Sequence, residues 1–225
     1  MSQDHQNHHH LHDHDHDHDH DHDHPHAPPQ PDDKVHSYHQ ILSIALKELL
    51  IEKGVVTAAE VRQFIEKRDS ITPANGAKVV ARAWVDPAYR ARLFEDGNAA
   101  AAELGFPITG TKLVAVENTP DTHNVVVCTL CSCYPRDLLG LPPAWSKSRA
   151  YRARIVREPR AVLREFGTDV PDDMALRVHD STADIRFLVV PQRPAGTEGL
   201  DEHALAALVT RDSMIGVARI EEGTH

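Results

Sequence analysis

All three cysteines of the chain fall within six residues, at Cys128, Cys131 and Cys133. Cysteines this close together cannot supply a disulfide framework that ties distant segments to one another. The chain must therefore fold around a hydrophobic core, and 225 residues, 40% of them hydrophobic, suffice for one well-packed domain plus an appendage. The cluster itself indicates a metal or redox site.

The N-terminal segment has a composition of its own. Residues 1–26 hold 12 of the 18 histidines, mostly alternating with aspartate, and the stretch 25–31 is rich in proline. With almost nothing apolar to bury, residues 1–33 are expected to be a disordered tail that ends in an extended linker. Clustered imidazoles and carboxylates bind divalent transition metals, so the tail is predicted either to sequester or deliver metal or to be an inert solubilising segment.

Charge and hydropathy exclude two classes of partner. The formal net charge is -10, but residues 1–33 contain nine aspartates and no Lys, Arg or Glu, which leaves -1 for the rest of the chain. A nearly neutral body offers no basic face for nucleic acid. No run reaches the roughly 18 apolar residues that a membrane span needs, and the N-terminus lacks the order of a signal peptide. We therefore expect a cytoplasmic protein with no membrane partner.

Hydrophobic spacing predicts helices first and mixed elements afterwards. A helix should begin after Ser37, and Thr57 with Glu60 forms a capping box for a second helix. The other expected helices begin at Pro73 and Pro87 or cover about 98–104, 151–157, 159–166 and 202–209, and the expected strands cover 113–116, 125–127, 175–178 and 186–190. The pattern predicts an α+β fold, layered rather than a parallel doubly wound sheet: a helical N-terminal region (34–110) is followed by a layered α/β region that carries the cysteines (111–225).

Two common cysteine sites fit the cluster poorly. An iron–sulfur cluster or a structural zinc normally needs a fourth protein ligand, and the histidines well beyond the linker region show no ligand-like spacing: His123, His179, His203 and the terminal His225. A redox-active Cys-x-x-Cys motif accounts for Cys128 and Cys131 but not for Cys133.

The triplet Cys131-Ser132-Cys133 permits a more specific geometry. If both thiolates bind one ion, the deprotonated backbone nitrogens of Ser132 and Cys133 can bind it too, which places two sulfurs and two nitrogens in one plane. Cys128 can then supply an axial sulfur and leave the opposite position open for water or substrate. Amide nitrogens suit trivalent cobalt or iron and do not suit zinc.

The segment VCTLCSC at 127–133 resembles the claw motif of the nitrile hydratase alpha subunit, and the resemblance extends over most of residues 37–220. Supporting stretches are AWVDP at 83–87, LGLPPAW at 139–145, YRARIVREPR at 151–160 and PQRPAGTEG at 191–199. The resemblance implies the alpha-chain fold and the hydration of small nitriles to amides.

The resemblance also implies the metal site. Cys128, Cys131, Ser132 and Cys133 would bind one low-spin Co(III) per chain, with Fe(III) as the alternative ion, and Thr129 matches the cobalt form of the motif. Cys131 would be oxidised to sulfinate and Cys133 to sulfenate, while Cys128 stays a thiolate. Cys133, Cys131 and Ser132 would form the catalytic group, and the Cys133 sulfenate or an activated water would attack the nitrile carbon.

Partners follow from the same resemblance. A beta-type nitrile hydratase subunit would complete a heterodimer, and from it a heterotetramer, because two of its arginines bond the cysteine oxygens in this family. The chain alone would then be inactive. A cobalt-loading activator protein is a further implied partner.

Two departures from the nitrile hydratase pattern leave the substrate open. Thr109 stands where the family usually has glutamine, and Arg136 stands where it usually has tryptophan. Tyr-Pro-Arg at 134–136 is similar to the same stretch in the gamma subunit of thiocyanate hydrolase, an enzyme that converts thiocyanate to carbonyl sulfide and ammonia. That gamma subunit also carries a His/Asp-rich N-terminus. Against that alternative, Leu-Pro-Pro at 141–143 has the nitrile hydratase form, and the chain lacks the insertion that thiocyanate hydrolase has before its claw. A non-catalytic metal carrier is the second alternative, and it would exchange divalent metal readily.

Overall fold

The computed structural model describes residues 37–131 and 133–220. Ser37 opens the unit to which these residues belong. The predictions for the tail and linker, and for Ser132, concern residues outside the described ones, and the boundary at 110/111 stays a prediction. No helix in the described ranges is long and apolar enough to cross a membrane.

Two helices open the described chain and are stabilised by their caps. α1 (Tyr38–Glu52) and α2 (Ala58–Asp69) both begin with a capping box, supplied by Ser37 and Thr57. Neither helix contains a buried residue. Large apolar side chains on and between them are therefore exposed: Tyr38, Ile41, Leu42, Ile44, Leu46, Leu49, Val55, Phe64 and Ile65.

The next three helices lie where the sequence predicted helices, and each contributes buried residues to the core. They are α3 (Pro73–Val85), α4 (Pro87–Glu95) and α5 (Gly97–Glu103). Proline opens α3 and α4, where the missing N–H costs nothing because the first-turn donors have no helical acceptor. α3 contributes the buried Val79 and Val80 and packs against α9 (Glu202–Leu208).

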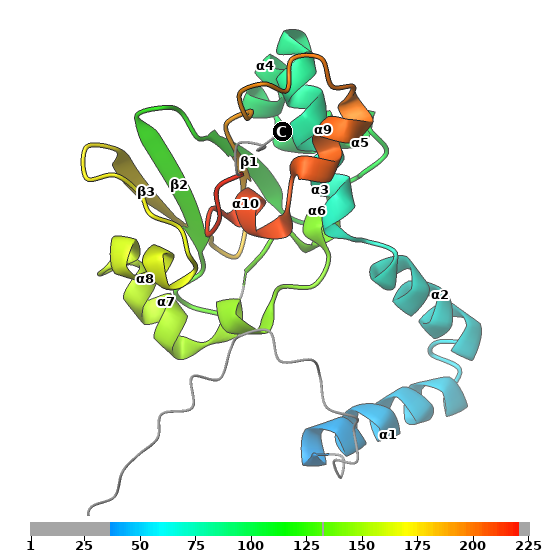
Figure 1. The fold of residues 1–225 in the computed structure, drawn as a ribbon. Helices are drawn as coiled ribbons and strands as arrows, with labels where there is room; N and C mark the ends of the chain where they lie inside the picture. Colours follow the sequence, from blue (N-terminus) through cyan, green and yellow to red (C-terminus); the bar gives the residue numbers. More distant parts are fainter. Residues whose placement is uncertain (1–36, 132, 221–225) are drawn as a thin grey trace, which may run out of the picture. The chain divides into compact units, whose positions relative to one another are not determined.

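Four strands form two parallel pairs (Figure 1). β1 (Lys112–Glu117) pairs with β4 (Ile185–Val190), and β2 (Thr122–Val127) pairs with β3 (Ala175–Asp180). β2 also contacts β4, and the short helix α10 (Arg211–Ile215) packs on both. Helices on small sheets confirm the predicted α+β class, and neither pair extends into a doubly wound sheet among the described residues.

Four short helices connect β2 to its partner β3. α6 (Arg136–Leu139) and the 3-10 helix η1 (Ala144–Lys147) follow the cysteines, and α7 (Arg149–Ile155) and α8 (Pro159–Glu165) lead to β3. The sequence did not predict α6, η1 or α10, because one turn is too short to show a 3.6-residue period.

Candidate metal centre

The cysteine cluster begins where β2 ends. Val125, Val126 and Val127 are buried, and the register pairs Val127 with Asp180, the last residue of β3. The core therefore fixes the direction of the chain as it enters the cluster. Cys128 is buried at 4% exposure, Cys131 is exposed, and Cys133 is partly exposed.

The three thiols converge on one another. The Sγ atoms of Cys128 and Cys131 are 3.5 Å apart, and those of Cys131 and Cys133 are 3.2 Å apart. The backbone N–H of Cys131 donates to Cys128 Sγ at 3.3 Å, which turns the loop back on itself. All three sulfurs lie within 4.8 Å of one another, so the donor set fits a single thiophilic ion. Within the described ranges, no other group of three His, Cys, Asp or Glu side chains brings its potential ligand atoms this close together.

The protein surroundings of Cys133 disfavour its thiolate form. Burial raises the pKa of Cys133 to about 12, with further contributions in the same direction from the Cys131 and Cys128 thiols. The positive charge of Arg186 acts in the opposite direction, because a nearby cation stabilises a thiolate.

A clamp on Thr129 fixes the loop between the first two cysteines. The backbone N–H of Thr129 donates to Asp180 Oδ1 at 2.9 Å, and its hydroxyl donates to Asp180 Oδ2 at 2.5 Å. On the other side, Arg152 Nη1 of α7 donates to the Thr129 carbonyl oxygen at 3.2 Å. Sequence reasoning did not find Asp180 or Arg152, because parallel pairing and packing bring them to the loop from distant segments.

Two cavities adjoin the cluster. The smaller, of about 20 Å³, is lined by Cys128, Cys133, Tyr134 and neighbouring apolar residues, and it has room for about one water molecule. The larger, of about 180 Å³, is lined by Thr109, Arg136, Tyr134 and Arg186. The two positions at which the sequence departs from the nitrile hydratase pattern, Thr109 and Arg136, thus line one cavity beside the residue that follows Cys133.

An ion pair closes part of the larger cavity. Arg68 Nη1 of α2 lies 2.6 Å from Asp137 Oδ1, and the Thr109 backbone N–H donates to Asp137 Oδ2 at 3.3 Å. Asp137 is therefore paired with Arg68, and Arg136 and Arg186 are the other charged residues that line the cavity.

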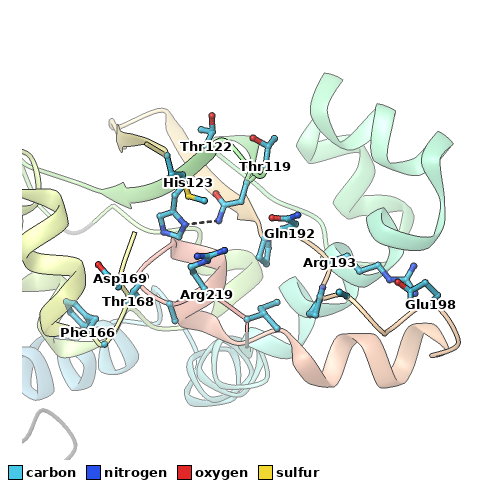
Figure 2. A pocket seen from close by; sticks show the side chains of 18 residues that line it. Thr119, Thr122, His123, Phe166, Thr168, Asp169, Gln192, Arg193, Glu198 and Arg219 are labelled. Carbon is cyan, nitrogen blue, oxygen red and sulfur yellow. Dashed lines mark hydrogen bonds between the residues drawn. The ribbon is translucent and has the colours of Figure 1, made fainter. Parts of the chain in front are cut away.

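A further cavity, of about 800 Å³, lies at the opposite end of β2 and is lined by no cysteine (Figure 2). His123 in its wall is 1% exposed, and its Nε2–H donates to the Gly216 carbonyl at 2.8 Å. Its Nδ1 accepts from Asn118 Nδ2 at 3.3 Å, since Asn118 Oδ1 already accepts from the Asn124 backbone. His123 is thus a neutral, fully bonded core residue, and burial lowers its pKa.

The second histidine near the sheets is also committed to the fold. His179 Nε2 lies 2.8 Å from Asn124 Oδ1, and the Asn124 backbone N–H donates in turn to Asn118, the asparagine that bonds His123. Desolvation and the charge of Arg177 lower the pKa of His179. Among the described residues, the group of potential metal ligands at the cysteines includes neither of these two histidines.

Comparison with known proteins gives a consistent family. The family model described as nitrile hydratase, alpha chain, matches residues 37–218. The chain is 53% identical over 177 residues, 77% of this chain and 87% of the relative, to the high-molecular weight cobalt-containing nitrile hydratase subunit alpha of Rhodococcus rhodochrous. It is 44% identical over 202 residues, 84% of this chain and 83% of the relative, to the thiocyanate hydrolase subunit gamma of Thiobacillus thioparus.

A solved structure agrees with both the sequence match and the fold. A histidine double mutant of the Fe-type nitrile hydratase from Comamonas testosteroni Ni1 superposes with a TM-score of 0.78 at 44% identity, covering 83% of this chain and 92% of that one. The resemblance seen in the claw motif and in the flanking stretches is thereby confirmed along nearly the whole described chain. The chain belongs to the nitrile hydratase alpha-chain family.

Proposed function

We propose that this chain is the metal-bearing subunit of a cobalt nitrile hydratase, which hydrates nitriles to amides. The observation that carries the proposal is the convergence of three sulfurs within 4.8 Å of one another on a loop anchored at Thr129. The high identity to a cobalt-containing alpha subunit supports cobalt over iron, as does Thr129 in the motif.

Cys128, Cys131 and Cys133, with the backbone nitrogens of Ser132 and Cys133, would hold the ion. Bound there, trivalent cobalt would act as a Lewis acid towards the nitrile group. We propose that Cys131 is a sulfinate, Cys133 a sulfenate and Cys128 a thiolate, in keeping with the burial of Cys128 and the greater exposure of the other two. The oxygen on Cys133, or a water beside it, would attack the nitrile carbon.

The proposal includes partners. A beta-type nitrile hydratase subunit would cover the exposed side of the cluster and complete the enzyme, and an activator protein would load the cobalt. Relatives named as subunits of nitrile hydratase and thiocyanate hydrolase support the need for a second chain. The cytoplasmic location stays a prediction from the sequence.

One experiment tests the main proposal. The chain is co-expressed with a beta-type subunit in cobalt-supplemented cells, and metal content, intact mass and hydration of a small nitrile are measured. One cobalt per chain, about three added oxygens and an amide product are expected. A complex that contains cobalt but forms no amide from any small nitrile would contradict the proposed reaction.

Thiocyanate hydrolysis is the second candidate because the cavity beside Tyr134 carries Arg136 and Arg186. Two cations suit an anionic substrate better than a neutral nitrile. Assaying the same complex with thiocyanate distinguishes the two candidates, since carbonyl sulfide and ammonia would assign the chain a gamma-type role. A metal carrier, the third candidate, would exchange divalent cobalt freely and need no partner.

The His/Asp tail is proposed to assist cobalt loading and to have no part in turnover. Deletion of residues 1–33 should slow loading at limiting cobalt and leave the rate per bound cobalt unchanged. A large loss of turnover at full cobalt occupancy would refute this assignment.

A further inference from the structure

Tyr134, the residue that follows the third cysteine, carries a buried hydroxyl group without a partner. The residue is 5% exposed, and its ring belongs to the hydrophobic core. Its carbonyl oxygen accepts from the backbone N–H of Arg136 at 2.7 Å, but its hydroxyl oxygen has no hydrogen-bond partner among the residues that the structure describes. Buried tyrosine hydroxyls usually find a partner, because the cost of removing them from water is otherwise uncompensated. The hydroxyl of Tyr134 therefore points to a bound ligand.

The two other buried tyrosines are satisfied by the protein itself. Tyr89 Oη donates to the Ala100 carbonyl oxygen at 3.0 Å, and Tyr151 Oη donates to the Val126 carbonyl oxygen at 3.3 Å. The fold thus supplies acceptors for its other buried phenols, and within the described ranges Tyr134 is the exception.

Two charged side chains at the start of α10 also carry buried atoms without a partner. Arg211 Nε and Asp212 Oδ1 make no hydrogen bond within the described part of the chain. They lie 3.7 Å apart, which is longer than a direct hydrogen bond and leaves both atoms available to a shared water. Burial raises the pKa of Tyr134, the charge of Arg211 lowers it, and the charge of Asp212 raises it, so both charges act on this hydroxyl.

The three atoms are complementary to water in their hydrogen bonding. Arg211 Nε–H is a donor, Asp212 Oδ1 is an acceptor, and the Tyr134 hydroxyl can be either. Buried waters typically make about three hydrogen bonds to polar groups that the protein leaves unsatisfied. We infer that ordered water hydrogen-bonds the Tyr134 hydroxyl to Arg211 and Asp212, and that Tyr134 is thereby a positioning residue for Cys133.

The consequence for Cys133 follows from the connectivity of the chain. Cys133 and Tyr134 share a peptide bond, so water that fixes the Tyr134 side chain to α10 also restricts the backbone at Cys133. α10 packs on β2 as well, the strand that leads into the cysteines. The water would thus tie both ends of the cysteine cluster to the same helix. The inference rests on the proposed function, because Cys133 is a metal ligand only under that proposal.

A double-mutant cycle on the unfolding of the full chain tests the water link. Tyr134→Phe and Asp212→Ala each remove one partner of the water and should each raise the unfolding equilibrium constant about fivefold. Because both act on the same water, the double variant should stay well below the roughly 25-fold product of two independent losses. Asp212→Asn keeps the acceptor oxygen and should retain the wild-type unfolding constant.

Tyr89→Phe is the matched control, because it makes the same change at a buried tyrosine of α4 that has its own acceptor. Its effect on the unfolding constant should multiply fully with that of Asp212→Ala.

The positioning role is measured on the cobalt-loaded complex with a beta-type chain. Tyr134→Phe and Asp212→Ala should lower kcat severalfold and leave KM within about twofold, since they act through Cys133 rather than on the substrate. The visible absorption of the cobalt centre should shift in both variants and stay unchanged in Tyr89→Phe.

Full multiplication of the Tyr134→Phe and Asp212→Ala effects, or an Asp212→Asn variant as unstable as Asp212→Ala, overturns the water link. So does a high-resolution crystal structure of the complex in which a protein atom, rather than water, bonds the Tyr134 hydroxyl. Wild-type kcat and absorption in Tyr134→Phe overturn the positioning role. A complex that holds cobalt but hydrates no nitrile contradicts the proposed function instead, and the unfolding and absorption measurements then decide the inference.

Discussion

Replacing Asp180 with alanine should loosen the metal loop without touching a proposed metal ligand. Asp180 accepts two hydrogen bonds from Thr129, one from the backbone N–H at 2.9 Å and one from the hydroxyl at 2.5 Å. Both bonds cross from the end of β3 to the loop that follows β2. The substitution removes both acceptors and leaves the strand pairing intact, because alanine keeps the backbone of residue 180.

The expected loss can be estimated from the bonds. A net contribution of about 1 kcal/mol for each bond would total about 2 kcal/mol, and the exposure of Asp180 reduces this to about 1–2 kcal/mol. For a domain of this size, that loss corresponds to a decrease in Tm of roughly 2–8 °C. Residues that orient metal ligands typically change metal affinity by about 10–100-fold when substituted, so cobalt loading at limiting metal should fall as well.

Thermal unfolding by circular dichroism and cobalt content after loading at limiting metal provide the assay. Asp173→Ala, at an exposed position just before β3, is the control and should change neither quantity appreciably. Thr129→Val should reproduce about half of the stability loss, because it keeps the backbone bond and removes only the hydroxyl. If Asp180→Ala behaves like Asp173→Ala in both assays, Thr129 is not held by this carboxylate and the clamp has no role in loading.

Three other predictions follow from the site and the core. Cys131→Ser and Cys133→Ser should each abolish nitrile hydration in the complex and remove the added oxygens at that position, as read by activity and intact mass. Burial lowers the pKa of His123 in the folded state, so the unfolded chain takes up the proton first and the free energy of unfolding should fall as pH drops below about 6.5. His123→Gln should reduce this pH dependence in urea titrations from pH 7.5 to 5. An unchanged pH dependence would contradict the assignment of His123 as a buried neutral histidine. Gly216→Ala should destabilise by more than about 4 kcal/mol, since Gly216 has φ +82° and an added Cβ would lie 1.9 Å from the Asn124 carbonyl oxygen. Gly105→Ala, also at φ +82° but in open space, should cost only about 1–2 kcal/mol by the same denaturation assay.

The sequence predicted those parts of the fold and site that depend on neighbouring residues. The long N-terminal helices were identified from apolar spacing and capping boxes, and the thiol cluster from three cysteines that a single turn of loop must bring together. The four strands were located as β-branched runs, although their limits extend by a few residues.

Features that depend on distant residues could not be found in this way. Nothing near Asp180 indicates that parallel pairing with β2 will bring its carboxylate to Thr129, and nothing near Gly216 indicates that its carbonyl will bind His123. The convergence of Thr109 and Arg136 on one cavity likewise follows from tertiary packing. The role of Ser132 stays a prediction from the motif.

The parallel pairing of β2 with β3 also affects when, during synthesis, Asp180 becomes available to bond Thr129. Two parallel strands need a long crossover, here the segment that contains α6, η1, α7 and α8, so β3 is made well after the cysteines. At typical translation rates this delay is on the order of seconds. During that interval the three thiols exist without the carboxylate that fixes Thr129. Metal could therefore enter a loop with Thr129 bonded to Asp180 only after β3 has been made. An ion bound earlier by the nascent chain would meet the three thiols on a loop that lacks these two hydrogen bonds.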